Sequence, residues 1–158
     1  AIGTWLATEN VHLLTGGGGG VMESVSRAFS AVAKRKGLVI GVIPGASSSE
    51  GYFPRDGYPN RWTELAIFTH LPFSGEDGTD VLSRNHINIL SSDVLIALPG
   101  ASGTASEVRL ALRYRRPIVA YLGNRDQIPG LPHEIRVENE LENVQAFVHA
   151  RVSQDLRA

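Results

Sequence analysis

Two glycine-rich segments of the sequence carry residues that could bind an anion. The first is Gly16-Gly17-Gly18-Gly19-Gly20, which lies between an apolar run over 11–15 and an apolar-periodic run that starts at Val21. The second spans 98–107, between an apolar run over 94–98 and an apolar-periodic run over 108–114. Both have the order strand, turn, helix, and a helix start presents unpaired N–H groups and a positive dipole end. The sequence therefore predicts two phosphate-binding turns that hold one phosphorylated ligand from two sides.

Each turn also has a purely structural interpretation. The binding candidates at the two turns are Gly16, Gly17, Gly18, Gly19, Gly20, Met22, Pro99, Gly100, Ser102, Gly103, Thr104 and Glu107. The five glycines could form a plain turn that needs positive φ angles or close packing, and Met22 could belong to the core. Thr104 could cap a helix that begins at Ala105, with Glu107 completing a capping box. Both interpretations stay open beside the binding hypothesis.

A third set of candidates lies on a helix expected over 79–91, capped by Thr79 or Asp80. Arg84 and Asn88 are four residues apart and would share one face of this helix with Asn85. Polar side chains on a helix that must also pack favour a ligand crevice, although a solvated face would explain them equally well. Arg84, Asn85 and Asn88 are therefore candidate ligand-binding residues.

Several other chemistries are excluded by the motifs they require. Val21 stands where the third glycine of a dinucleotide-binding G-x-G-x-x-G motif belongs, and no Gly-Lys pair is present for a Walker A loop. The segment from Gly100 to Gly103 is one residue too short for a nucleophile elbow. The five histidines show no metal-ligand spacing, and the absence of cysteine excludes disulfides and thiolate chemistry. No metal site and no required cofactor are predicted.

The alternation of strands and helices predicts an α/β fold. Strands are expected over 11–15, 38–43, 63–70, 94–98, 117–122 and 135–137, and helices over 1–8, 21–36, 79–91, 105–115 and 141–154. Near-continuous apolar strands are typical of a parallel sheet that is covered on both faces, so a doubly wound parallel sheet flanked by helices is predicted. Such a sheet usually opens on a strand. Because this chain opens on a helix, the first strand is expected to be missing from it.

Two segments are assigned from local composition. Lys34, Arg35 and Lys36 would compensate the dipole in the last turn of the helix over 21–36, and Gly37 would be its C-terminal cap. The segment 46–61 is rich in Ser, Gly, Pro and aromatic residues, and is predicted to be a long loop without a function assigned to it.

Length and composition set outer limits on function. The 158 residues fit a single domain over 1–158, and 15 Lys and Arg residues against 16 Asp and Glu residues exclude a basic nucleic-acid surface. No apolar run approaches the roughly 20 residues of a membrane-spanning helix, and no signal peptide is visible. The expected protein is soluble and cytoplasmic, with a phosphorylated small molecule as its partner.

These residues resemble a known family. The glycine run followed by Val21-Met22, then Arg84, then Pro99-Gly100-Ala101-Ser102-Gly103-Thr104-Ala105-Ser106-Glu107 is similar to the Rossmann-like superfamily once labelled "possible lysine decarboxylase". That superfamily includes the LONELY GUY phosphoribohydrolases and the molybdenum cofactor carrier proteins. The resemblance runs from Ala1 to about Leu122. The family motif is PGGxGTxxE, and Ala101 replaces its second glycine.

The resemblance implies two alternative functions. In the phosphoribohydrolases, which include cytokinin-activating enzymes, Arg84 and Glu107 would be catalytic in cleaving the N-glycosidic bond of a nucleoside 5′-monophosphate. Those enzymes usually carry Met-His-x-Arg-Lys where this chain has Val81-Leu82-Ser83-Arg84-Asn85. The Arg-Asn-x-Ile-Asn form looks more like the carrier branch, which binds a phosphorylated pterin.

The leading hypothesis is therefore a carrier-like binding protein with molybdenum cofactor as cargo, and the hydrolase is the alternative. Nothing marks a pyridoxal phosphate lysine, so lysine decarboxylation is excluded. The resemblance also implies a homodimer or larger homo-oligomer.

Overall fold

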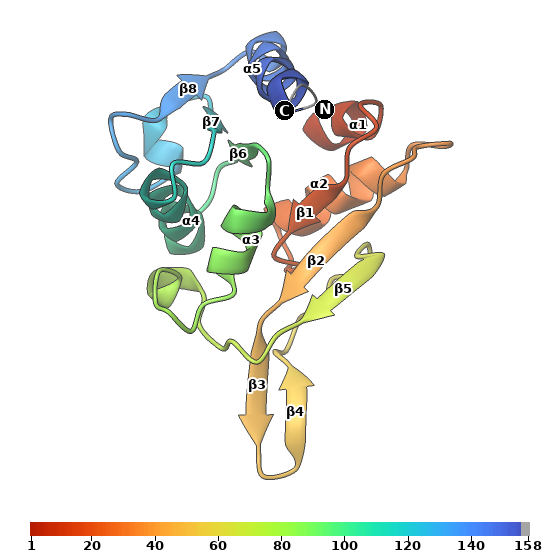
Figure 1. Cartoon of the computed structure of the whole chain (residues 1–158), viewed down its shortest axis with the longest axis vertical. Coiled ribbons are helices and arrows are strands. Elements are labelled where there is room, and N and C mark those ends of the chain that lie inside the picture. Colours follow the sequence, from red (N-terminus) through yellow and green to blue (C-terminus); the bar gives the residue numbers. More distant parts are fainter. Residues whose placement is uncertain (156–158) are drawn as a thin grey trace. The chain divides into compact units, whose positions relative to one another are not determined.

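The computed structural model describes residues 1–155, and these form two compact units, each with its own parallel sheet (Figure 1). The first unit comprises Ala1–Phe73 and Leu82–Arg84, and the second comprises Ser74–Val81 and the chain from Asn85 onward. A single domain over 1–158 stays a prediction.

The first unit is built on a three-stranded parallel sheet. Its strands are β1 (Leu13–Thr15), β2 (Val39–Ile43) and β5 (Leu65–Phe68), in the order β1-β2-β5, and its helices are α1 (Ile2–Leu6) and α2 (Val21–Ser30). Buried Ala7, Phe29 and Val39 join the helices to the sheet. Gly3 lets α1 lie directly on α2, because a Cβ there would be 2.5 Å from the carbonyl oxygen of Val25. Apolar strand residues and one apolar helix face thus produce the predicted layers.

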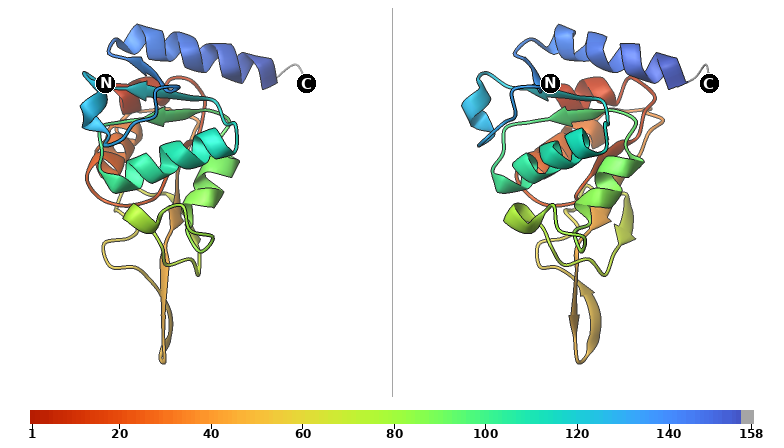
Figure 2. Two further views of the ribbon diagram at one scale, coloured as in Figure 1. Left: turned by 90° about the vertical axis from the view of Figure 1, so that its left-hand side faces the viewer. Right: turned by 60° about the vertical axis from the view of Figure 1, so that its left-hand side comes forward.

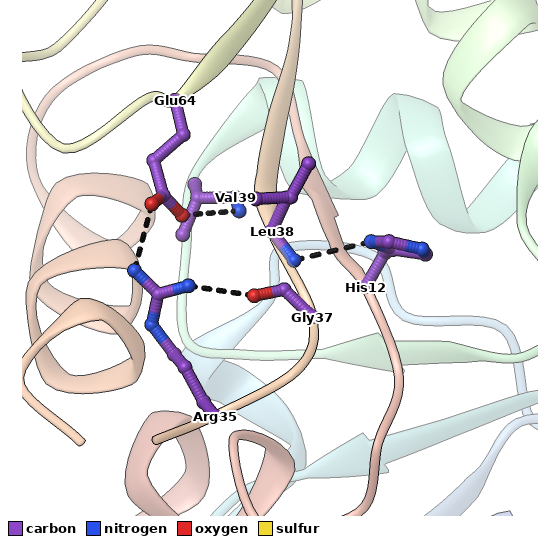
Figure 3. Close-up of polar contacts among 6 residues, drawn as sticks. All are labelled: His12, Arg35, Gly37, Leu38, Val39 and Glu64. Atoms are coloured by element: carbon purple, nitrogen blue, oxygen red, sulfur yellow. Dashed lines mark hydrogen bonds and ion pairs between the residues drawn. The ribbon is translucent and has the colours of Figure 1, made fainter. Parts of the chain in front are cut away.

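The end of α2 differs from the prediction. The helix stops at Ser30 with Ala31 as its C-cap, so Gly37 does not cap it. The basic trio, Lys34, Arg35 and Lys36, lies beyond the last turn of the helix. Arg35 instead donates to the Gly37 carbonyl at 2.6 Å and to Glu64 at 2.7 Å (Figure 3). The other Glu64 oxygen accepts the Val39 amide at 2.9 Å. Gly37 is required by packing, because a Cβ there would lie 1.7 Å from the carbonyl oxygen of Val11.

The segment 46–61, predicted to be a loop, contains most of a β-hairpin. Strands β3 (Gly45–Ser48) and β4 (Gly51–Pro54) pair antiparallel, and the hairpin projects beyond the ends of β2 and β5 (Figure 2). Residues 46–53 are exposed, so neither strand has the apolar alternation by which a half-buried strand is recognised. Gly51 permits the tight turn with φ of +127°.

The second unit carries a second three-stranded parallel sheet, β6 (Leu95–Ala97), β7 (Ile118–Tyr121) and β8 (Arg136–Glu138). Its helices are α3 (Asn85–Ser91), α4 (Ser102–Arg113) and α5 (Leu141–Asp155), with the 3-10 turns η1 (Gly75–Asp77) and η2 (Arg125–Gln127). Its core includes Val108, Ala120 and Leu122, all nearly inaccessible to solvent. Parallel strands connected through helices confirm the predicted α/β class, while the missing first strand stays a prediction.

The Arg35–Glu64 pair makes stability depend on pH. Burial raises the pKa of Glu64, but the hydrogen bonds from Arg35 and the Val39 amide, with the Arg35 charge, outweigh it and lower the pKa overall. A lowered folded-state pKa stabilises the fold above the unfolded pKa, and that contribution disappears as pH falls through the folded pKa. Glu64→Gln should therefore cost about 0.5–1 kcal/mol of unfolding free energy at pH 7, the range for partly exposed pairs, and much less near pH 3.

Urea unfolding of both proteins at the two pH values measures this difference. Glu50→Gln in the exposed β3–β4 turn is the control and should leave the unfolding free energy unchanged. An equal loss at pH 7 and pH 3 would contradict the assignment.

Candidate functional site

The glycine run in the first unit forms the connection from β1 to α2. Gly17 and Gly20 have φ angles of +72° and +66°, a backbone conformation that residues other than glycine rarely adopt. Gly17 also lies against β2, where a Cβ would be 2.3 Å from Cδ1 of Ile43. At Gly16, a Cβ would be 2.1 Å from Nη2 of Arg84. Glycine is therefore needed here both for backbone conformation and for close approach.

Protein donors hold three successive carbonyl groups of this turn. Arg84 donates to the Gly16 carbonyl at 3.5 Å, and the backbone amide of Asn60 donates to the Gly17 carbonyl at 2.7 Å. The Asn60 side-chain amide donates to the Gly18 carbonyl at 2.8 Å. The carbonyl oxygens are thereby directed into the protein, which fixes the conformation of the turn.

The backbone N–H groups of this turn differ from its carbonyl groups. Among the described residues, no hydrogen bond to protein is formed by the backbone N–H groups of Gly18, Gly19, Gly20, Val21 and Met22, and no side chain caps α2. Together with the positive end of the ten-residue helix, successive unpaired amides form an anion-binding nest. Glu23 in the first turn is a competing negative charge, since its Oε2 would be 4.0 Å from a Cβ at Gly19. The turn can bind an anion through its backbone.

Residues that follow the hairpin complete this turn, and the sequence did not identify them. Besides Asn60, Tyr58 lies on Gly18, where a Cβ would be 3.0 Å from its ring and 2.7 Å from Cε of Met22. Met22 was predicted at this turn, whereas Tyr58 and Asn60 belong to the segment without an assigned function. An asparagine side chain can donate and accept at once, but its target here is 42 residues away along the chain. No local signal could reveal that contact.

The second glycine turn lies in the second unit and leads from β6 into α4. The helix begins at Ser102, three residues earlier than predicted, with Ala101 as N-cap and no side-chain cap. Thr104 is therefore inside the helix, and the proposed capping box with Glu107 is wrong. Thr104 Oγ1 instead lies over Gly100, where a Cβ would approach it to 2.1 Å. This leaves the amides of Ser102, Gly103 and Thr104 in the first helical turn, where no intrahelical acceptor is available.

The η1 segment lies on the first two turns of α4. Buried Ser106 donates to the Gly75 carbonyl at 2.9 Å, and a Cβ at Gly78 would be 2.8 Å from Cβ of Ser106 and 2.6 Å from Nδ2 of Asn85. The sequence did not identify this role of Gly75, Gly78 and Ser106. Asn85, predicted to line a crevice, is almost completely buried against Gly78.

Helix α3 starts at Asn85, so the predicted shared helical face of Arg84 and Asn88 is wrong. Arg84 precedes the helix and is 3% exposed, with its guanidinium at Gly16 in the first unit. Asn88 is also buried, and its Oδ1 accepts no hydrogen bond in the part of the chain that is described. Glu107 is half-buried in α4. The contribution of these residues to one ligand site stays a prediction.

His86, one of the five histidines, has structural partners. His86 Nδ1 lies 2.6 Å from the Tyr114 hydroxyl, and Nε2 lies 2.8 Å from the Asp80 carbonyl. Because the carbonyl can only accept, Nε2 carries the proton.

Within the described residues, no group of three His, Cys, Asp or Glu side chains is arranged for a metal ion, and no helix could span a membrane.

Asn60 provides a direct test of how the first turn is held. Asn60→Ala removes the donor to Gly18 and the acceptor at 3.0 Å for the Trp62 amide, and should lower the unfolding free energy by about 1–3 kcal/mol. Denaturant unfolding measures the loss, and Trp62 fluorescence reports the local change. Asn139→Ala, at an exposed position after β8, should have no effect. Equal stability of the two variants would show that Asn60 does not hold the turn.

Comparisons with known proteins were consistent with the fold. The structure resembles the molybdenum cofactor binding protein of the phototrophic bacterium Rippkaea orientalis, with a TM-score of 0.65 and 28% identity, covering 96% of this chain and 83% of that one. It also resembles TM1055, a structural-genomics target, with a TM-score of 0.67 and 21% identity, covering 94% of this chain and 84% of that one. The likeness to TM1055 concerns the fold alone.

Sequence comparison identifies the family. An uncharacterized protein of Archaeoglobus fulgidus is 31% identical over 113 residues, or 71% of this chain, which spans only 60% of that relative's length. The model of the SLOG cluster4 family matches residues 1–154. These matches confirm the superfamily that the glycine run, Arg84 and the segment 99–107 resemble. The chain belongs to the SLOG cluster4 family.

Proposed function

We propose that this protein binds a phosphorylated pterin or nucleotide-like small molecule, as a molybdenum cofactor carrier does. The observation that carries the proposal is the turn at Gly16–Gly20, where carbonyls bond inward and five successive amides remain available at the start of α2. Backbone amides oriented in advance bind an anion without a further ordering cost, which favours affinity.

Charge at this turn supports a phosphate over a neutral ligand. The guanidinium of Arg84 lies at Gly16, where its positive charge and the α2 dipole raise the local potential. In the second unit, the α4 start offers further amides at Ser102, Gly103 and Thr104. Support for a pterin comes from the structural neighbour that is a molybdenum cofactor binding protein at 28% identity. Molybdenum cofactor would be the cargo, held by its phosphate at the amides of the Gly16–Gly20 turn.

The position of Glu23 distinguishes an anionic ligand from a neutral one. Its carboxylate lies beside Gly19 and repels an anion bound at the turn. In water, two unit charges about 4 Å apart interact by about 1 kcal/mol. Glu23→Gln should therefore tighten the binding of a phosphorylated ligand about two- to fivefold, with a smaller gain at high salt. Equilibrium binding of molybdenum cofactor and of GMP, each at two salt concentrations, measures this.

Glu50→Gln makes the same charge change away from the turn and should leave affinity unchanged. No measurable affinity of the unmodified protein for molybdenum cofactor would overturn the pterin proposal. Tight binding of GMP alone would favour a nucleotide instead. Equal affinity of the Glu23→Gln and unmodified proteins would contradict an anion at this turn.

The hydrolase alternative has its own outcome. If Arg84 and Glu107 act on a nucleoside 5′-monophosphate, incubation with a panel of these compounds releases free base that chromatography detects. Loss of that release in a folded Glu107→Gln variant would assign catalysis to Glu107. If no member of the panel releases free base, the hydrolase alternative is excluded and the binding role remains.

We also propose that the protein self-associates, as the family resemblance implies.

A further inference from the structure

We propose that the outer edge of β5 pairs antiparallel with β5 of a second copy of this chain, which joins two three-stranded sheets into one of six strands. The proposal rests on the self-association proposed above and names its surface. It is independent of the ligand, because β5 contains none of the residues assigned to the anion turns.

The backbone of β5 is available on one side. Its inner side pairs with β2, and no other strand of the described first unit pairs with its outer side (Figure 1). The Thr69 amide, directly after β5, donates to the Ile43 carbonyl in register with the strand pairing and therefore points toward β2. Because successive residues of a strand alternate in direction, the N–H and C=O groups of Ile67 and Leu65 also point toward β2, and those of Ala66 and Phe68 point outward. These are the groups that a further strand would bond.

The side chains of β5 are unusually exposed for apolar residues. Leu65, Ile67 and Phe68 are 47%, 44% and 54% exposed, and β5 contains no charge or proline of the kind that protects sheet edges. β1, at the other edge of the same sheet, has only half-buried residues. The exposed edge is therefore specific to β5.

The hairpin extends this apolar surface. Tyr52 and Phe53 on β4 are 40% and 50% exposed. The Tyr52 hydroxyl and the carbonyl of Thr69, the residue after β5, both lie against Gly45, so hairpin and strand are adjacent. With a fully exposed aromatic side chain at roughly 150–250 Å², the five residues leave on the order of 400 Å² of apolar surface uncovered. A standard interface buries about 800 Å² per partner, slightly more than half of it apolar, so this surface matches what a dimer requires.

The direction of the backbone also selects a register. Outward-pointing Ala66 must occupy a hydrogen-bonded pair, which places inward-pointing Leu65 and Ile67 in non-hydrogen-bonded pairs. With Ala66 on the two-fold axis, Leu65 of each copy lies opposite Ile67 of the other, which buries four apolar side chains on one face. The Cα atoms of Leu65 and the opposing Ile67 would then be only about 4.5 Å apart, the spacing at which opposing side chains are closest.

The absence of cysteine from the sequence permits a clean test by disulfide mapping. Single cysteines at Leu65, Ala66, Ile67 and Phe68 are oxidised mildly in the full chain and cross-linking is followed by non-reducing electrophoresis. Ala66→Cys should cross-link fastest, because this residue lies opposite its own copy and about 5.5 Å between the two Cα atoms suits a disulfide. Val21→Cys, 44% exposed on α2, is the matched control and should remain uncross-linked.

Solution mass gives the second measurement. Light scattering should show an assembly whose dissociation constant rises about tenfold or more in Ile67→Lys, because a charge enters the paired edge. Val81→Lys, at a position that is 79% exposed in the second unit, should leave the mass unchanged.

A monomeric unmodified protein would overturn both self-association and its surface. An assembly that is insensitive to Ile67→Lys, with no cross-link at any β5 position, would overturn the surface alone. Neither result would affect ligand binding. Circular dichroism confirms that Ile67→Lys is folded before its mass is interpreted.

Discussion

The hydrogen bonds from Asn60 to the glycine turn are the interaction on which the candidate site depends. Five consecutive glycines have little conformational preference, and ordering them costs backbone entropy that their own side chains cannot offset. Asn60 donates to two neighbouring carbonyls, and Arg84 donates to a third. Once those carbonyls are directed inward, the following amides have no acceptor within the described protein and become the binding surface.

In the second unit, different contacts hold the start of helix α4. No side chain caps α4, and Gly100 is held through its amide by the carbonyl of Gln127 at 3.0 Å. The first turns of the helix are covered by the η1 segment through Ser106 and Gly75. Here packing of a neighbouring turn, and not a donor aimed at each carbonyl, positions the backbone. Both arrangements leave amides at a helix N-terminus, the feature that the proposed phosphate ligand requires.

Polar contacts also connect distant segments at the opposite ends of the first unit's strands. Glu64 bonds Arg35 and the Val39 amide, and the Leu38 amide donates to His12 Nδ1 at 3.1 Å (Figure 3). The basic trio of the sequence thus includes a specific partner for a carboxylate on another element. Arg35 is tied to the start of β2 and the approach to β5, whereas the ligand turn lies where β1 ends.

The sequence by itself determined the α/β class, both glycine turns and their position between a strand and a helix. Apolar periodicity and glycine placement are local properties, so they predict elements even though helix ends moved by several residues at α2, α3 and α4. Only the tertiary structure decided which residues hold the turns. Asn60, Tyr58 and Ser106 act across long separations, and the hairpin of β3 and β4 is stabilised by pairing that its exposed residues do not encode as a pattern. Such contacts depend on which distant segments the tertiary fold brings together, so no local sequence pattern predicts them.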